Sequence, residues 1–131
     1  MELNQILIDT NIYSLAMRGD TNIVSILQRV ESIFVTPVIV GELLAGFKGG
    51  NREKQNRIQL QQFLDSPRVA VLNIDENTSG FYSAVFHQLK KSGKPIPTND
   101  LWIAASALQH QLALFSRDRH FEYVNNINLL S

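Results

Sequence analysis

The sequence predicts an α/β fold, an open three-layer α/β/α sandwich whose strands run in parallel. Short runs of apolar and β-branched residues recur along the chain, and their lengths suit strands that are covered on both faces. Longer segments with helical spacing separate these runs, and strands that alternate with helices pair in parallel through right-handed crossovers. The expected strands are residues 5–8, 33–35, 69–72, 112–115 and 127–130.

Three segments between the expected strands have helical spacing, and in two of them, residues 21–30 and 79–91, the apolar residues form a stripe on one face. In residues 21–30 this stripe consists of Ile23, Ile26, Leu27 and Val30. The other two segments are residues 52–64, with Ile58, Leu60, Phe63 and Leu64, and residues 79–91, with Phe81, Val85 and Leu89. The stripes predict helices that bury one side and expose the other.

Two more helices have clear start signals. In TPVIVGELL, Thr36 can cap a helix and Pro37 suits its first position, because the N–H that proline lacks has no partner there. In PTNDLWIAASALQH, Pro97 ends the preceding segment, and Thr98 or Asn99 can cap the alanine-rich helix that follows.

Size and composition limit the class of protein. A chain of 131 residues is most simply one domain, residues 1–131. Its 12 basic and 12 acidic side chains cancel, which argues against a protein that coats nucleic acid through a global positive field. No cysteine is present, so disulfides and thiolate metal sites are excluded. Without a secretory signal or an apolar run of roughly 20 residues, the chain is expected in the cytoplasm rather than in a membrane.

Four acidic residues occupy positions where their side chains can meet. Asp9 directly follows the first expected strand, and Asp118 comes just after the fourth. Asp100 lies in the first turn of the alanine-rich helix, and Glu42 lies among apolar and small residues in the helix that begins TPVIV. Ligands of open α/β folds bind outside the carboxyl ends of the strands. We therefore expect the three aspartates at one edge of the sheet.

Each acid alone also has a structural explanation. Asp9 and Asp118 could cap following helices, Asp100 suits the positive end of a helix dipole, and Glu42 could be an exposed helix glutamate. Together, however, several carboxylates in one cleft cannot all stay ionised without a cation or strong pKa shifts. Oxygen ligands without cysteine indicate Mg²⁺ or Mn²⁺ rather than zinc. The chemistry that fits this set is metal-assisted phosphodiester hydrolysis.

Polar neighbours of the acids are candidates to orient them, to hold a coordinated water or to cap a helix. These are Thr10, Asn11, Asn99 and Ser116. The histidines show neither HxH nor HExxH spacing, so we do not expect a histidine metal site. We expect His120, which precedes Phe121, to pack or cap locally.

Four segments, in this order along the chain, resemble the PIN-domain nucleases, and most strongly the VapC-like toxins of bacterial toxin–antitoxin pairs. The segments are DTNIYS (9–14), VIVGELLAG (38–46), IPTNDLWIAASAL (96–108) and LALFSRDRHF (112–121). Each contains its acid at the matching position, and the resemblance covers essentially the whole chain. Single pieces such as DTN are weak signals, but four in the right order are strong.

The resemblance implies a mostly parallel five-stranded sheet and Mg²⁺- or Mn²⁺-dependent ribonuclease activity. It also implies a homodimer that a small cognate antitoxin neutralises. Carried over by position, the acidic site is Asp9, Glu42, Asp100 and Asp118. Ser116 stands where the family often has threonine, so a hydroxyl is kept. Basic residues that could contact the RNA are Lys94, Arg117 and Arg119.

Other functions are less consistent with the residues. A phosphoacceptor receiver domain needs an aspartate after its third strand, where this chain has Asn73, and a dehalogenase-type phosphatase needs one at Asn11. Two alternatives stay open: a non-catalytic RNA- or partner-binding protein of the same fold, and a housekeeping RNA-processing nuclease without an antitoxin. An antitoxin would lay an amphipathic helix into a groove between the helical segments 12–30 and 43–64.

Overall fold

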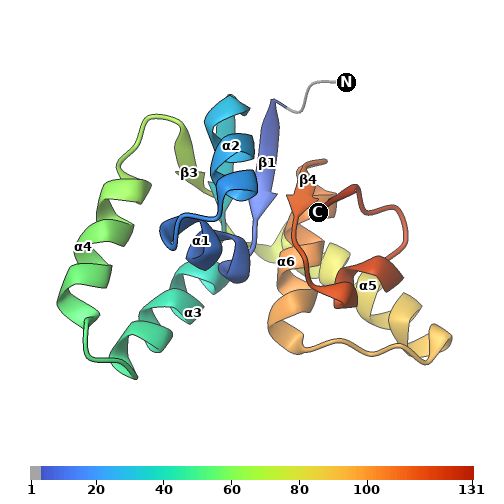
Figure 1. Ribbon diagram of the computed structural model, residues 1–131. Coiled ribbons are helices and arrows are strands. Elements are labelled where there is room, and N and C mark those ends of the chain that lie inside the picture. Colours follow the sequence, from blue (N-terminus) through green and yellow to red (C-terminus); the bar gives the residue numbers. More distant parts are fainter. Residues whose placement is uncertain (1–3) are drawn as a thin grey trace.

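The computed structural model describes residues 4–131, in which five strands form one sheet with the order β3-β2-β1-β4-β5 (Figure 1). All neighbouring strands pair in parallel. β1 lies at the centre, with Leu7 opposite Phe34 of β2 and Leu114 of β4. The predicted fold class is confirmed. The strands are β1 (Gln5–Ile8), β2 (Ser32–Val35), β3 (Val69–Val71), β4 (Ala113–Phe115) and β5 (Leu129–Leu130).

The helices form two layers, one on each side of the sheet. The first four follow β1 and β2 and group together, whereas α5 and α6 lie together on the other side and connect β3 to β4 (Figure 1). A short 3₁₀ helix, η1 (Arg119–Tyr123), follows β4. The α-helices are α1 (Thr10–Met17), α2 (Thr21–Arg29), α3 (Pro37–Lys48), α4 (Glu53–Leu64), α5 (Glu76–Ser92) and α6 (Thr98–Gln109).

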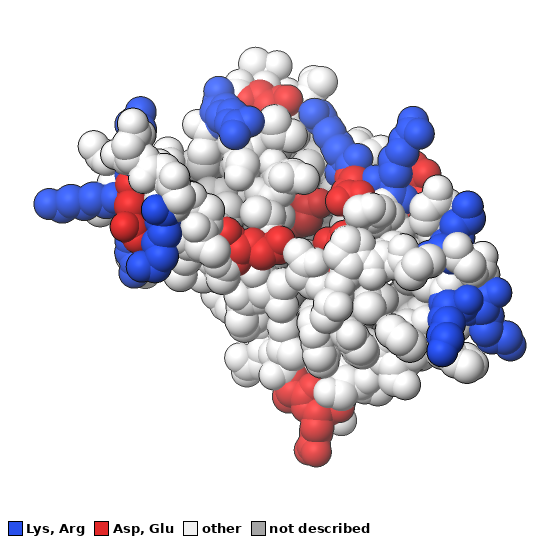
Figure 2. Space-filling view, turned by 90° about the horizontal axis from the view of Figure 1, so that it is seen from below, with Lys and Arg blue, Asp and Glu red and all other residues white. Residues whose placement is uncertain are grey.

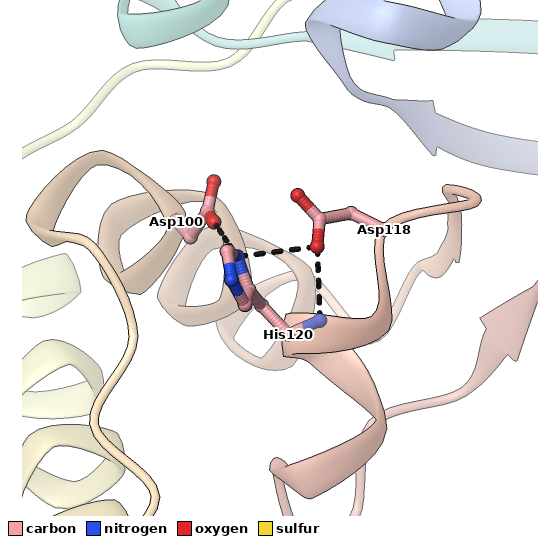
Figure 3. Close-up of side chains that lie close together, drawn as sticks. All are labelled: Asp100, Asp118 and His120. Atoms are coloured by element: carbon pink, nitrogen blue, oxygen red, sulfur yellow. Dashed lines mark hydrogen bonds and ion pairs between the residues drawn. The ribbon is translucent and has the colours of Figure 1, made fainter.

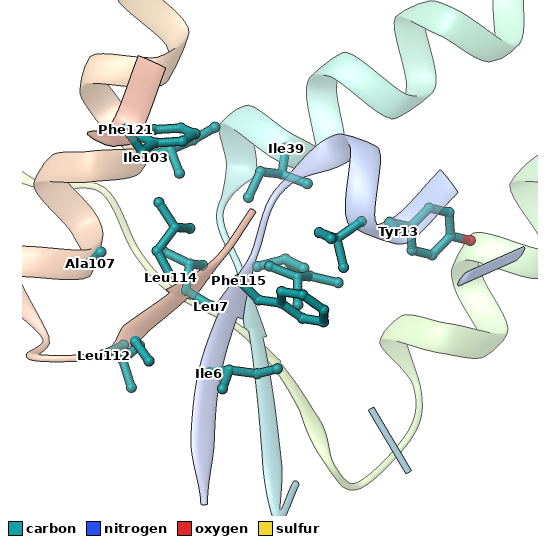
Figure 4. Packing of buried hydrophobic residues seen from close by; sticks show 14 of the residues in the cluster. Ile6, Leu7, Tyr13, Ile39, Ile103, Ala107, Leu112, Leu114, Phe115 and Phe121 are labelled. Carbon is teal, nitrogen blue, oxygen red and sulfur yellow. The ribbon is translucent and has the colours of Figure 1, made fainter. Parts of the chain in front are cut away.

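The hydrophobic core fills the space between the central strands and both helical layers (Figure 4). β1 is buried on both faces, and Ile6, Leu7 and Ile8 are fully buried. Phe115 of β4 and Ile39 of α3 are also fully buried in the same cluster. Burying each such side chain stabilises the fold by about 1.5–3 kcal/mol. The ends of β1 and β4 are therefore rigid supports for the residues that follow them.

The two outermost strands are less buried than the sequence pattern indicates. The run 69–72 was expected as a strand covered on both faces, but β3 is an edge strand in which Ala70 and Val71 are exposed. At the other edge, only Leu129 and Leu130 of the run 127–130 form a strand, and both are half-buried. A run of apolar residues gives composition but not position in the sheet, so it could not separate edge strands from central ones.

The expected stripe of residues 79–91 is wrong at one residue, and α4 buries less of its apolar side chains than its composition suggests. Val85 and Leu89 of α5 are buried, but Phe81 is 39% exposed. In α4, Leu60 is the buried residue, and Ile58 is 52% exposed. Between residues 4 and 131 no helix combines the length and the apolar character that crossing a bilayer requires.

Candidate active site

The carboxyl ends of β1 and β4 lie side by side, and an acid follows each. Ile8 pairs with Phe115, so the chain after β1 and the chain after β4 leave the sheet together. The N–H of Asp9 donates to the carbonyl of Phe115 at 3.4 Å. A cavity of about 270 Å³ opens here. It is lined by Asp9, Thr10, Asn11, Glu42, Pro97, Asn99, Asp100, Ile103, Asp118 and His120.

Asp9 is almost completely buried, with 5% exposure. Its Oδ1 accepts a hydrogen bond from the N–H of Ile12 at 2.9 Å and so caps α1, while Oδ2 accepts one from the hydroxyl of Ser116. Burial raises the pKa of Asp9, and the charges of Asp118 and Asp100 raise it further, against the lowering effect of the two hydrogen bonds. The helix-cap explanation therefore holds for this residue, and its carboxylate also lines the cavity. Asp9 caps a helix and also faces other acids.

Ser116 connects the two strand ends. It is 1% exposed, and its hydroxyl donates to Oδ2 of Asp9. The hydroxyl oxygen of Ser116 also accepts a hydrogen bond from the N–H of Asp118 at 3.0 Å. One buried hydroxyl thus fixes the Asp9 carboxylate and the backbone of Asp118 relative to each other, which is the supporting position expected for it.

Glu42 is held at both of its carboxylate oxygens. The hydroxyl of Thr10 donates to Oε1 at 2.9 Å, and the side-chain amide of Asn99 donates to Oε2 at 2.7 Å. Thr10 was expected to orient Asp9, but it contacts Glu42 instead. Neither Thr98 nor Asn99 caps α6, because Pro97 occupies the N-cap position and the cap has no side-chain hydrogen bond. Asn99 instead joins α6 to α3.

His120 lies between two of the acids (Figure 3). Its Nδ1 is 2.9 Å from Oδ2 of Asp100 and 3.1 Å from Oδ1 of Asp118. The same Oδ1 of Asp118 accepts from the N–H of His120 at 2.9 Å and caps η1. The sequence reasoning missed this histidine as a site residue. The available signal was its distance of two residues from Asp118, because a capped turn brings residue i+2 back toward its cap.

The electrostatics of the cavity favour a bound cation. Burial raises the pKa of Asp100, and the charges of Asp118 and Glu42 add to this, while His120 opposes it. The hydrogen bond to Asp100 in turn raises the pKa of His120. Carboxylates whose pKa values rise because they are buried near like charges are stabilised in the ionised form by a nearby cation. The cluster could therefore hold a divalent metal ion, with ligand atoms of Asp100, Asp118 and His120 all within 4.8 Å of one another.

The basic candidates Lys94, Arg117 and Arg119 are not among the residues that line the cavity. Figure 2 shows acidic side chains gathered across the middle of one face, with lysines and arginines toward its margins. Arg117 is 3.4 Å from Asp20, the N-cap residue of α2, and Lys94 lies over the ring of Tyr123 with its Nζ 5.1 Å from the centroid. Arg119 is exposed at the start of η1.

A second cavity, of about 510 Å³, opens beside the first between α1 and the pair α3 and α4. Thr10 and Glu42 line both cavities. The other residues of this α1–α3–α4 groove are Tyr13, Ser14, Met17, Arg18, Leu43, Gly46, Phe47, Arg52, Asn56 and Gln59. The groove thus lies between the two helical segments from which a partner site was expected.

Comparison with known proteins adds an independent result. The family model of the PIN domain matches residues 6–127. The toxin FitB of Neisseria gonorrhoeae is 31% identical over 122 residues, which cover 86% of this chain and 87% of that protein. Ribonuclease VapC1 of Haemophilus influenzae is 29% identical over 128 residues, 92% of each chain. Among solved structures, VapBC-1 from nontypeable Haemophilus influenzae superposes with a TM-score of 0.84 at 26% identity, covering 97% of both chains.

Proposed function

Because this chain belongs to the PIN-domain family, we propose that it is a metal-dependent endoribonuclease and the toxin of a toxin–antitoxin pair. The observation that carries the proposal is that Asp9, Glu42, Asp100 and Asp118 line one cavity at the carboxyl edge of the sheet. Relatives that cover most of the chain are a ribonuclease, VapC1, and a toxin, FitB.

We assign metal binding to the acids and take the ion to be Mg²⁺ or Mn²⁺, since both prefer hard oxygen ligands. When bound, such an ion lowers the pKa of a coordinated water and stabilises negative charge on phosphate oxygens. The ligand side chains in this proposal are Asp9, Glu42, Asp100 and Asp118. The donor set fits a hard cation because it consists of carboxylates, and two of them, Asp9 and Asp100, have pKa values raised by burial and by neighbouring acids.

The neighbouring polar groups hold these carboxylates in position. Ser116 aims the Asp9 carboxylate by donating to Oδ2, while Oδ1 is fixed by the first turn of α1. Thr10 and Asn99 fix both oxygens of Glu42 and so hold this proposed ligand in the cavity. Side chains fixed this way lose little orientational freedom when the substrate binds, and this preorganisation is what rapid hydrolysis requires.

RNA is the substrate in this proposal, and exposed basic residues near the acidic cavity would contact its phosphates. Lys94 and Arg119 are exposed and suited to this role. Arg117 is partly neutralised by Asp20, so its contribution should be smaller.

For the antitoxin we propose the α1–α3–α4 groove. Met17, Leu43 and Phe47 give it an apolar floor, and Arg18 and Arg52 place positive charge at its rim. An amphipathic helix with acidic residues beside its apolar face suits such a surface. Because the groove shares two lining residues with the acidic cavity, a helix bound there would also cover the approach to the acids.

A binding assay tests the groove. The product of a small gene adjoining this one should be retained by the wild-type chain and lost with Phe47→Glu, whereas Phe81→Glu on α5, outside the groove, should keep it. Equal binding by the two variants would reject this placement of the partner. We further propose that the chain forms a cytoplasmic homodimer, which light scattering on the purified protein would measure.

The catalytic proposal is tested by incubating the purified chain with total RNA and Mn²⁺ or Mg²⁺. We expect cleavage that stops with EDTA and with Asp100→Asn. Tight RNA binding without cleavage would favour a non-catalytic role. Cleavage by a chain with no adjoining antitoxin gene would favour a housekeeping RNA-processing nuclease.

A further inference from the structure

The position of His120 is set by the elements on both sides of it. Asp118 caps η1 through the N–H of His120, and the next residue, Phe121, is 1% exposed and anchors the helix in the core. The imidazole ring is therefore held above the first turn of α6, between the carboxylates of Asp100 and Asp118 (Figure 3). The side chain of His120 is 46% exposed, so its position results from these anchors and contacts rather than from burial.

The spacing of the three donor atoms matches the edges of a coordination octahedron. Two ligand atoms at right angles, each about 2.1 Å from an ion, lie about 3.0 Å apart. Nδ1 of His120 lies 2.9 Å from Oδ2 of Asp100 and 3.1 Å from Oδ1 of Asp118. The present distances therefore match those between neighbouring ligands of one cation, so Nδ1 can become a ligand beside each carboxylate oxygen without moving far.

The ring needs only a change of tautomer to become a ligand. When Asp100 and Asp118 are ionised they only accept hydrogen bonds, and Nδ1 is then the donor in both contacts. A neutral imidazole can carry its hydrogen on Nε2 instead, and this frees the Nδ1 lone pair without changing the charge of the ring. Because nearly half of the His120 side chain is exposed, water can carry the hydrogen between the two nitrogens.

We infer that Nδ1 of His120 is a ligand of the ion held by Asp100 and Asp118, and that this nitrogen makes the site prefer Mn²⁺ over Mg²⁺. Both ions take hard oxygen ligands, but Mn²⁺ is a first-row transition metal that also accepts an imidazole nitrogen, whereas Mg²⁺ keeps oxygen ligands and water in a strict octahedron. The inference rests on the proposed function, because it requires the acidic cavity to hold a divalent cation. It adds a fifth side chain to the proposed ligands and a choice between two metals.

Pulsed electron paramagnetic resonance of the Mn²⁺-loaded protein tests the nitrogen directly, since a coordinated imidazole gives a ¹⁴N modulation that carboxylates do not. We expect this modulation in the wild-type protein and its loss in His120→Asn. The chain has 3 histidines. His87 and His110 are both exposed and outside the cavity lining, so His87→Asn and His110→Asn are matched controls that should keep the signal.

Calorimetric titration with each metal tests the preference. His120→Asn should weaken Mn²⁺ binding by at least about tenfold, the loss common even for residues that only support metal ligands, and should weaken Mg²⁺ binding much less. An equal loss for both metals would overturn the preference. Modulation that persists in His120→Asn, or that is absent from wild-type protein saturated with Mn²⁺, would overturn the ligand itself.

These outcomes are separable from failure of the proposed function. If the wild type binds Mn²⁺ without nitrogen modulation and Asp118→Asn abolishes that binding, the acidic site stands and His120 is not a ligand. If Asp118→Asn binds Mn²⁺ as tightly as the wild type, the metal site of the proposed function is wrong, and this inference fails with it. The wild-type spectrum is decisive alone, so a folding defect in a variant cannot rescue the inference.

Discussion

Replacing Asp9 by asparagine should have opposite effects on stability and on activity. Asparagine caps helices as well as aspartate does, so Asp9→Asn keeps the bond from Ile12 that begins α1. It has nearly the same shape and still reaches the hydroxyl of Ser116. What the substitution removes is one buried negative charge in a cavity lined by three other acids.

The size of the effect follows from two opposing terms. Losing the ionised acceptor weakens two hydrogen bonds by about 1 kcal/mol each. Removing the buried charge relieves a desolvation penalty of several kcal/mol. Because burial outweighs both bonds in setting the pKa of Asp9, the sum favours the variant, and we expect a net stabilisation of about 1–2 kcal/mol in metal-free buffer. This corresponds to a rise in melting temperature of about 3–10 °C.

Bound metal should make the wild type more stable than Asp9→Asn. A ligand at 100 times its dissociation constant stabilises the folded state by about 2.7 kcal/mol. The wild type should gain this with Mn²⁺ and the variant should not, so the wild type should melt below Asp9→Asn in EDTA and above it in Mn²⁺. RNA cleavage by the variant should fall to about one hundredth or less, as expected when a metal ligand is lost.

Thermal melts in the two buffers measure this crossing, and Asp75→Asn is a matched control. Asp75 also caps a helix, α5, but hydrogen bonds lower its pKa, so its charge is favourable in the fold. Asp75→Asn should therefore not raise the melting temperature in either buffer and should leave cleavage intact. If Asp9→Asn behaves like this control, Asp9 is only a helix cap, and the reasoning is refuted.

Three further results are expected. In EDTA, the melting temperature should fall as pH rises. Asp9 and Asp100 have pKa values raised above the unfolded value of 3.8, so the folded state binds more protons than the unfolded state and loses stability as these protons leave. The stabilising pairing of protonated His120, fully present below its unfolded pKa of 6.5, is likewise lost as pH rises through its raised pKa. A flat profile from pH 4 to 8 would contradict this, and saturating Mn²⁺ should weaken the slope. Ser116→Ala should lower the free energy of unfolding, measured by chemical denaturation, by about 1–3 kcal/mol and should reduce cleavage, because two hydrogen bonds are lost. Ser116→Thr keeps the hydroxyl and should restore both stability and cleavage. If threonine restores neither, the hydroxyl does not have this role. Lys94→Ala should reduce the slope of RNA affinity against salt by about one, and an unchanged slope would leave Lys94 an ordinary surface residue.

Much of the fold could be predicted because its signals are local. Apolar runs such as 5–8 and 112–115, separated by helical stripes, fix an α/β alternation, and the Thr36–Pro37 start signal holds in the structure, where Thr36 caps α3. The order of strands is not a local property. That β4 lies beside β1, which brings Asp9 and Asp118 together, depends on how whole layers pack. The positions of the acids after strand ends predicted that the aspartates meet at one edge of the sheet, but not that β4 is the strand next to β1.

The supporting contacts of the candidate site were harder to predict, because they join residues far apart in the chain. Thr10 and Asn99 meet at Glu42, which is 32 and 57 residues away from them. The HxH and HExxH patterns used to find histidine metal ligands describe two histidines on the same strand or helix. They do not describe His120, whose partners come from α6 and the loop after β4. The spacing to Asp118 is local, but the contact with Asp100 becomes visible only when α6 and η1 are assembled.

The most direct measurement is anomalous diffraction from crystals of the wild-type protein soaked in Mn²⁺. If the fold gathers these acids to hold a cation, an anomalous peak should lie within bonding distance of the Asp100 and Asp118 carboxylates, in the cavity that Asp9 and Glu42 also line. The peak should be absent from Asp118→Asn crystals. A wild-type protein that cleaves RNA in Mn²⁺ yet shows no ion between these carboxylates would contradict the central claim.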